Sequence, residues 1–296
     1  MLPIRLVRGS GIRTRYIALS YCWGVVTEKT LRTTKATLVQ HEQGISWTAL
    51  PKTFQDTILV CRALDIRYLW VDALAIIQDD TDDWEEEAVK MASIYSNSWL
   101  TIAATSGHHS DAGILHKWFK KSHNTMIESG SRAIELRGHI FKLRPILTLA
   151  HNCFFKHGAS SQKTEDVAHP LLTRAWAFQE RVLPGKILHF HEEELFWECR
   201  VTAQCECGGY EPPSKTANKF FFLPRELIKT IRTHGLSQSE LGKAWFQMVG
   251  AYTTLNLTYE SDRLPALSGL AVQFHRSYLG DYVAGMWLGT LPEGLL

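Results

Sequence analysis

The sequence predicts an α/β protein, with a parallel sheet flanked by helices, from three observations in its first 105 residues. Short apolar runs alternate with longer segments whose apolar residues recur at helical spacing. The run YLWVDALAII (68–77) is apolar on both faces, as a central parallel strand is. The order strand, helix, strand, helix, strand is typical of parallel strands joined by right-handed crossovers.

The elements of this core follow in order. RYIALSYC (15–22), which Trp23-Gly24 closes, is expected to be a buried strand. Residues 50–66 are expected to form a helix, because Phe54, Ile58, Cys61 and Leu64 share one face and Pro51 suits a first turn. The second strand, a helix and a third strand then follow at 68–77, 82–95 and 99–106.

The pattern loosens after about residue 110, where we expect an α+β second half packed on the sheet. Residues 107–132 look like a long loop rich in Gly, Ser and His. The expected elements are a strand pair at 134–145, a helix at 173–183, a hairpin at 186–199, and helices within 224–256 and 264–279. We divide the chain into residues 1–110, 111–215 and 216–296, and the ending LPEGLL predicts that the protein continues further.

Composition excludes several classes of protein. A net charge of +2 without a long basic block gives no electrostatic footprint for nucleic acid or an anionic membrane. No uncharged apolar run reaches the eighteen or so residues of a membrane span, and the Arg-rich start is not a secretory signal. Six Cys are too sparse for a disulfide scaffold and fit a reducing compartment, so we expect a cytoplasmic protein.

Four ordered segments resemble the fungal heterokaryon-incompatibility (HET) domain. They are YIALSYCWG (16–24), the block at 68–98, LLTRAWAFQERVLPGKILHF (171–190), and LTYESDRLPALSGLA (257–271), which looks like a segment that often follows the domain. The resemblance implies an effector of non-self recognition and programmed cell death. The family's second block usually has L-C-I after its Asp, whereas this chain has Leu74-Ala75-Ile76. The sequence leaves open whether Ala75 is natural drift or a Cys-to-Ala substitution.

The HET domain is in turn remotely similar to the TIR domain, which has a flavodoxin-like parallel sheet. Ser20-Tyr21 matches the end of the first TIR strand, and Trp70-Val71-Asp72 matches the second. TIR domains that cleave NAD have a catalytic Glu on the next helix, and its spacing before the third strand falls on Glu87. The segment between Asp72 and Glu87 is longer than in TIR domains. The resemblance implies NAD as a substrate rather than a cofactor.

Cleavage of the nicotinamide–ribose bond passes through an oxocarbenium-like state, which one carboxylate beside the ribose can stabilise. We therefore assign Glu87 and Asp72 as the candidate catalytic residues. Ser20, Trp23 and Gly24 would shape the pocket at the carboxyl ends of the strands, Trp23 by stacking and Gly24 by letting a ligand approach the backbone.

Each of these residues has a structural alternative. Asp72 could cap a loop or pair with an Arg, and Glu87 could be an ordinary helix-start acid. Arg174 and Arg181 could hold a phosphate or pair with Asp72, and we favour an ion pair that links the second half to the sheet. The acids at 79–87 fit a solvated helix start better than a divalent cation site.

We expect no metal site and no reactive thiol. Cys199, Cys205 and Cys207 have the spacing C-x5-C-x-C, which matches no common zinc finger, and only His189 and His191 are near in sequence. Cys22 has no recognisable base beside it and is expected to be a buried thiol. The pair His108-His109 is expected to be solvated, and the chain lacks the glycine-rich fingerprints of triphosphate and dinucleotide sites.

Two rival functions remain open. One is a non-catalytic module whose TIR-like surface recruits partners, and the other is a thiol-dependent enzyme inactivated by Ala75. Because TIR enzymes are generally active only when assembled, the leading hypothesis also implies self-association, with an upstream receptor as a further partner.

Overall fold

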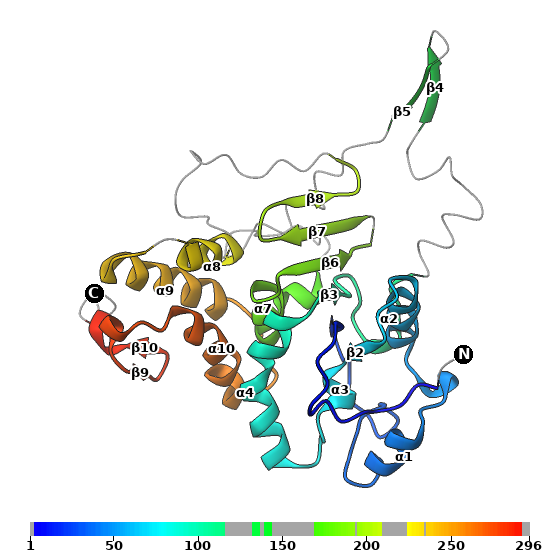
Figure 1. The fold of residues 1–296 in the computed structure, drawn as a ribbon, viewed down its shortest axis with the longest axis horizontal. Helices are drawn as coiled ribbons and strands as arrows, with labels where there is room; N and C mark the ends of the chain where they lie inside the picture. The colour runs from blue at the N-terminus through cyan, green and yellow to red at the C-terminus, as the bar shows by residue number, and fades with distance from the viewer. Residues whose placement is uncertain are drawn as a thin grey trace.

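A computed structural model describes residues 3–115, 132–136, 139–143, 169–192, 194–208, 224–233 and 235–291 of the 296-residue chain. Its centre is a six-stranded sheet in the order β2-β1-β3-β6-β7-β8 (Figure 1). The strands are β1 Tyr16–Ser20, β2 Tyr68–Trp70, β3 Leu100–Ala103, β6 Lys186–Phe190, β7 Leu195–Cys199 and β8 Ala203–Cys205. β2, β1, β3 and β6 run parallel to one another, and β7 and β8 continue the sheet with antiparallel pairing. The fold is therefore mixed α/β, as predicted.

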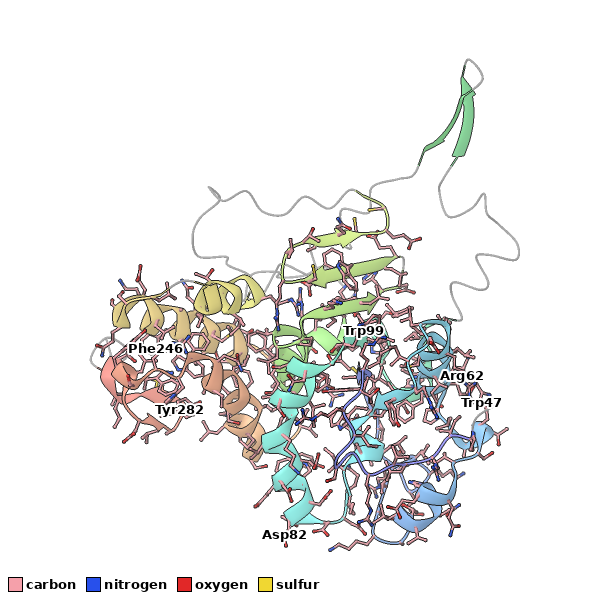
Figure 2. The ribbon with its side chains drawn as sticks, viewed as in Figure 1. Trp47, Arg62, Asp82, Trp99, Phe246 and Tyr282 are labelled. Carbon is pink, nitrogen blue, oxygen red and sulfur yellow. The ribbon has the colours of Figure 1, made fainter. Side chains whose placement is uncertain are left out.

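The sheet is covered on both faces because successive residues of β1 point to opposite sides. Ile17 and Leu19 pack in one apolar cluster with Phe54 of helix α2 (Lys52–Ala63). Ala18 packs in another with Tyr95 of helix α4 (Thr81–Asn97). On the α2 side, the guanidinium of Arg62 lies 5.5 Å from the ring centroid of Trp47, in the 3-10 turn Trp47–Ala49, and Figure 2 labels both.

The expectation of a central strand over 68–77 is wrong in two respects. β2 ends at Trp70 and is the edge strand, with all three residues half-buried. The chain then turns into the short helix α3 (Asp72–Ala75), in which the Asp72 carboxylate accepts the backbone N–H of Ala73 at 2.7 Å. Because Asp bonds so readily to nearby backbone, it starts a helix here and interrupts the apolar run.

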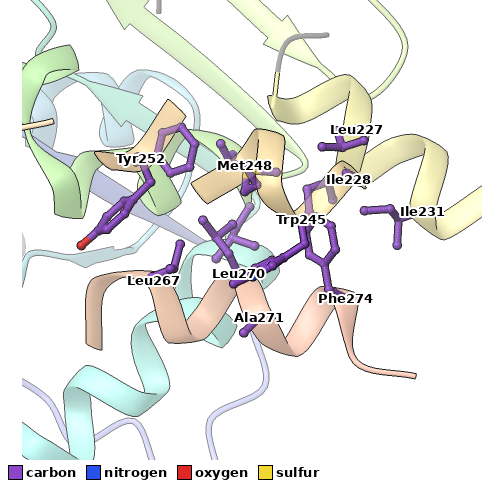
Figure 3. Close-up of a cluster of buried hydrophobic side chains, with 14 of the residues drawn as sticks. Leu227, Ile228, Ile231, Trp245, Met248, Tyr252, Leu267, Leu270, Ala271 and Phe274 are labelled. Carbon is purple, nitrogen blue, oxygen red and sulfur yellow. The ribbon is translucent and has the colours of Figure 1, made fainter. Parts of the chain in front are cut away.

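The second half adds helices to the same core. Helices α7 (Ala175–Val182) and α10 (Pro265–Phe274) pack together and against α4, and α8 (Pro224–Thr233) and α9 (Gln238–Thr253) complete the group. Figure 3 shows Trp245 of α9 among the apolar side chains of α8 and α10. This apolar cluster also contains Ala18 of β1, so the C-terminal helices and the sheet share one core.

Smaller elements connect these layers. They are α1 Leu38–Gln43, the hairpins β4 Arg132–Leu136 with β5 His139–Leu143 and β9 Tyr282–Val283 with β10 Met286–Trp287, and the 3-10 turns Ser110–Ala112, Pro170–Thr173, Glu260–Arg263, Ser277–Leu279 and Leu288–Thr290. The predicted strand pair near residue 138 and hairpin at 186–199 are confirmed, while most of the predicted loop at 107–132 lies outside the described residues. Among the described helices, none is both long and apolar enough to span a bilayer.

Candidate functional site

A cluster of polar side chains lies where β1 ends. Ser20, the last residue of the strand, is buried, and its hydroxyl donates to Oε2 of Glu180 at 2.5 Å. Glu180 lies on helix α7 and is itself only 7% exposed. Tyr95 of α4 lies beside them, and its hydroxyl donates to the carbonyl of Leu19 at 2.9 Å. Three elements that are distant in sequence therefore meet at the carboxyl end of β1, where ligands bind in parallel α/β sheets.

Asp72 joins this cluster from the first residue of α3, just after the neighbouring strand β2. Its Oδ2 accepts the indole N–H of Trp23 at 2.7 Å, and the Tyr21 hydroxyl is a further donor to the carboxylate. With the Ala73 N–H on Oδ1, these donors hold the carboxylate in one orientation. Asp72 and Trp23 are half-buried, in contrast to the buried Ser20 and Glu180.

Arg174 brings a positive charge to the two acids. It precedes the first residue of α7, and its guanidinium donates to the carbonyl of Tyr21 at 3.1 Å while lying beside the Cys22 thiol. Because both carboxylates feel the charge of Arg174, its field lowers the pKa of each. Arg174 therefore acts on Asp72 through its charge, and a direct ion pair between them is not among the contacts of the described residues.

Burial dominates the titration of both carboxyl groups. It raises the pKa of Asp72 above its usual value, against the opposing effects of Trp23, Ala73, Arg174 and Tyr21. Burial likewise raises the pKa of Glu180 to about 7, the hydrogen bond from Ser20 opposes this, and the charge of Asp72 adds to it. A carboxyl group with a pKa near neutrality can both give and take a proton, which is what a general acid or base needs.

Glu87 does not belong to this cluster. It lies on α4, where its carboxylate pairs with Lys90 at 2.9 Å, and Lys90 also pairs with Glu86 at 2.5 Å. The start of α4, marked by Asp82 in Figure 2, lies at the end of the helix away from Tyr95. The acids of 79–87 therefore behave as the helix-start alternative predicts, with Asp79 and Asp83 accepting the backbone N–H groups of Lys35 and Ile77.

Arg181 does not pair with Asp72 and does not lie at the polar cluster. Its guanidinium forms a two-pronged pair with Glu198 of β7, with N···O distances of 3.0 and 2.9 Å, and His189 lies 2.9 Å from the same carboxylate. All three side chains are buried. This pair joins helix α7 to strand β7, both within residues 111–215, and does not involve Asp72.

Gly24 is needed for packing between two loops. Its φ is +80°, and a Cβ built there would lie 2.4 Å from the Cβ of His109. The loop after β1 therefore lies directly against the loop after β3. His108 and His109 are exposed, as the sequence predicts.

Sequence reasoning missed Glu180, Tyr21 and Tyr95 as members of the cluster. The signal for Glu180 was present in AWAFQERV, where three consecutive polar residues sit in a short apolar helix. All three are buried, whereas a helix on the protein surface would expose such polar residues to solvent. The buried acid of such a helix must find donors, and Ser20 supplies one.

Comparison with known families matches the chain to one of them. The model of the family described as heterokaryon incompatibility protein (HET) matches residues 16–180, more than half of the 296 residues. Ser20, Trp23, Asp72, Arg174 and Glu180 all lie within that range. Neither the curated proteins nor the solved structures give a match to the chain. The sequence blocks and the family match agree: this chain belongs to the heterokaryon incompatibility (HET) family.

Proposed function

We propose that this chain is a cell-death effector of HET-type incompatibility that hydrolyses NAD at the nicotinamide–ribose bond, with Asp72 and Glu180 as the working carboxylates. The observation that carries the proposal is the pair of buried or half-buried acids at the carboxyl ends of β1 and β2, both with a raised pKa. A second carboxylate with a pKa of about 7 gives the site a group that can accept a proton at physiological pH.

The reaction needs little covalent chemistry from the protein. The bond between ribose C1′ and the nicotinamide nitrogen breaks, and its electron pair neutralises the pyridinium nitrogen, so nicotinamide leaves without being protonated. The ribose becomes oxocarbenium-like and is attacked by water, which loses one proton. The products are nicotinamide, ADP-ribose and that proton. A carboxylate beside C1′ stabilises the positive charge, and a second can take the proton.

The contacts of the two acids divide these roles. Asp72 is half-buried and is fixed by Trp23 and Ala73, so we assign it to the ribose. Glu180 is deeper and bonded to Ser20, which suits the final acceptor of the proton. Trp23 offers a ring for stacking, and Arg174 offers a fork that can pair with a phosphate.

The strand order supports the comparison with the TIR and flavodoxin-like folds. β1 lies between β2 and β3, so the chain adds one strand on either side of β1, and the cluster lies at this reversal. Open α/β sheets bind ligands at such a switch point. In this proposal Glu87, the residue that spacing alone selects, is a surface acid paired with Lys90.

A thiol mechanism has weaker support. Cys22 is the thiol at the cluster, and burial raises its pKa, which disfavours the thiolate that would attack. Ala75 ends α3 close to Asp72 in the chain. If the family's Cys at this position were the nucleophile, Ala75→Cys would restore activity and covalent labelling by iodoacetamide. We expect it to do neither.

A second candidate function, assembly without catalysis, has one observation in its favour. Val25 and Val26 follow Trp23-Gly24 and are 87% and 47% exposed. Apolar side chains in this position can take part in a contact between copies or with a receptor. The catalytic proposal also includes self-association, in a cytoplasmic setting. Assembly therefore does not distinguish the two functions, but only catalysis requires the carboxylates of Asp72 and Glu180.

The deciding experiment follows nicotinamide release from NAD by chromatography, with purified protein over a range of concentrations that includes assembled states. Asp72→Asn and Glu180→Gln are expected to lower the rate about 10²–10⁴-fold, the usual contribution of one acid–base group. Glu87→Gln is the matched control and is expected to keep the wild-type rate. Absence of release from every assembled state, or equal loss with Glu87→Gln, would contradict the proposal. Cell killing that persists in Asp72→Asn and is lost in Val25→Asp would favour assembly alone.

A further inference from the structure

A second cluster of chemically reactive side chains lies on β7 and β8, outside the proposed catalytic site. Glu194 immediately precedes β7, Cys205 ends β8, and Cys207 follows two residues later. One carboxylate oxygen and the two Sγ atoms all lie within 4.8 Å of one another. The Sγ atoms of Cys205 and Cys207 are 3.3 Å apart.

The burial of this group distinguishes it from a surface cluster. Glu194 is 1% exposed and Cys205 is 9% exposed, while Cys207 is half-buried. One Glu194 oxygen accepts the backbone N–H of Cys207 at 2.9 Å, which fixes the carboxylate against the thiol-bearing turn. The three donor atoms are therefore held close together in a largely buried site.

The donor set selects the class of cation. Two thiolates favour soft or borderline ions, and Zn²⁺ binds Cys sulfur at about 2.3 Å and carboxylate oxygen at about 2.0–2.2 Å. Tetrahedral angles with such bonds place two sulfurs about 3.7 Å apart. The present Sγ–Sγ distance of 3.3 Å requires only a small rotation of the side chains to reach that value.

A pair of histidines lies near this group in the chain. His191, whose backbone N–H donates to the Glu194 carbonyl at 3.2 Å, is buried and its Nε2 lies 2.8 Å from Nε2 of His169. A structural zinc site needs a fourth ligand, and imidazole is the commonest partner of thiolate. The pair is the imidazole source nearest to Glu194 in sequence.

We propose that Glu194, Cys205 and Cys207 bind one Zn²⁺ ion. The ion joins the β6–β7 turn to the end of β8, the last strand of the sheet. Leu172 and Cys207 both pack against the apolar cluster of Phe196 and Cys205, and Leu172 lies two residues before Arg174. The zinc site therefore supports the segment that brings Arg174 to the polar cluster.

The two sites lie at the same end of the sheet, where the parallel strands have their carboxyl ends, but on different strands. β6 runs parallel to β1, and its carboxyl end meets the start of β7 and the end of β8. Three to four strand spacings separate β1 from β7 and β8, which is about 14–19 Å at about 4.8 Å per strand. The zinc ion in this proposal is structural and takes no part in NAD chemistry. The spacing of the cysteines did not indicate this zinc site, because the third ligand, Glu194, comes from just before strand β7.

The test measures metal in the full chain purified under reducing conditions. Elemental analysis is expected to find about one zinc per chain, and thiol modification with a mercurial should release it to a chromogenic chelator. After chelator treatment, added Co²⁺ should give thiolate charge-transfer absorption and the visible bands of a tetrahedral site. Cys205→Ser with Cys207→Ser, and Glu194→Gln alone, should abolish or weaken this binding at least tenfold.

Cys199→Ser is the matched control, because Cys199 lies at the opposite end of β7 from Glu194, about 17 Å away along the strand. It is expected to bind metal like the wild type. A folded wild-type chain, checked by circular dichroism, that binds neither Zn²⁺ nor Co²⁺ would overturn the proposal. So would a Cys205–Cys207 disulfide in protein alkylated at cell lysis, or equal metal loss in Cys199→Ser. Because Co²⁺ titration uses the wild-type chain, the test does not depend on the variants folding.

Discussion

The hydroxyl of Ser20 donates to the carboxylate of Glu180 at 2.5 Å and joins the end of strand β1 to helix α7 across 160 residues of sequence. This bond connects the two ends of the family match at residues 16–180. It also connects the two halves of the chain, since α7 belongs to the helical group that packs on the α4 face of the sheet. Damage to either half should therefore disturb the polar cluster.

The raised pKa of Glu180 predicts a pH dependence of stability. The folded chain keeps the proton up to about pH 7, whereas an unfolded Glu loses it near 4.5. Between these values the folded state binds more protons, so its stability falls as the pH rises through this window. Glu180→Gln has no such proton to lose. Its free energy of unfolding, compared with that of the wild type, should therefore rise by about 1–3 kcal/mol between pH 4.5 and pH 8. Urea unfolding at both pH values measures the difference.

Glu87→Gln serves as the control for that experiment. Glu87 pairs with Lys90 on the outside of α4, and surface pairs of this kind contribute about 0–1 kcal/mol. Its stability relative to wild type should change little between the two pH values. A similar change in both variants would show that the effect does not come from Glu180.

The indole N–H of Trp23 is expected to set the pH range of activity. Its hydrogen bond lowers the pKa of Asp72, and Trp23→Phe removes the donor while keeping an aromatic ring. The pKa of Asp72 should then rise, so a reaction that needs the ionised carboxylate should lose activity at a higher pH than in the wild type. The acidic limb of the NAD-cleavage profile measures this shift. An unmoved limb together with a lower rate would mean that Trp23 acts only by stacking.

The buried pair of Arg181 and Glu198 should be far more important for stability than an exposed pair of the same type. Arg181→Met leaves the buried Glu198 carboxylate without its two-pronged partner, with only His189 and the charge of Arg225 among the described residues that act on it, and such losses cost about 3–5 kcal/mol. Arg263→Met removes the partner of Glu260, where both side chains are more than half exposed, and should cost about 0–1 kcal/mol. Urea midpoints of the two variants test this. Equal costs would contradict the structural role of Arg181.

Helix packing around Gly269 predicts opposite results for two Gly-to-Ala changes. A Cβ at Gly269 of α10 would lie 2.4 Å from Oε1 of Gln179 and 2.5 Å from Cβ of Ala92, so Gly269→Ala should destabilise the fold by about 1–3 kcal/mol. A Cβ at Gly250 of α9 would contact nothing within 4 Å, so Gly250→Ala should stabilise it by about 0.5–1 kcal/mol. Thermal unfolding of both variants gives the comparison. Loss of stability in Gly250→Ala would contradict it.

The sequence by itself determined the α/β class, the order of the elements and the family. Alternating and helical apolar patterns depend only on neighbours within a few residues, and β1, α2, α4, β3 and the β6–β7 hairpin appear where those patterns predict them. The length of β2 was wrong for an equally local reason. The Asp72 side chain accepts the backbone N–H of Ala73 and starts α3, which a pattern of apolar residues alone cannot predict.

The composition of the polar cluster was decided by tertiary structure alone. Spacing selected Glu87, but α4 turns that side chain toward Lys90, whereas α7 carries Glu180 to Ser20. Helical periodicity cannot rank the faces of α7, because the helix is buried on nearly all sides. The contact between residues 20 and 180 exists only because α4, α7 and α10 pack together on one face of the sheet, and that packing fixes which acid faces β1.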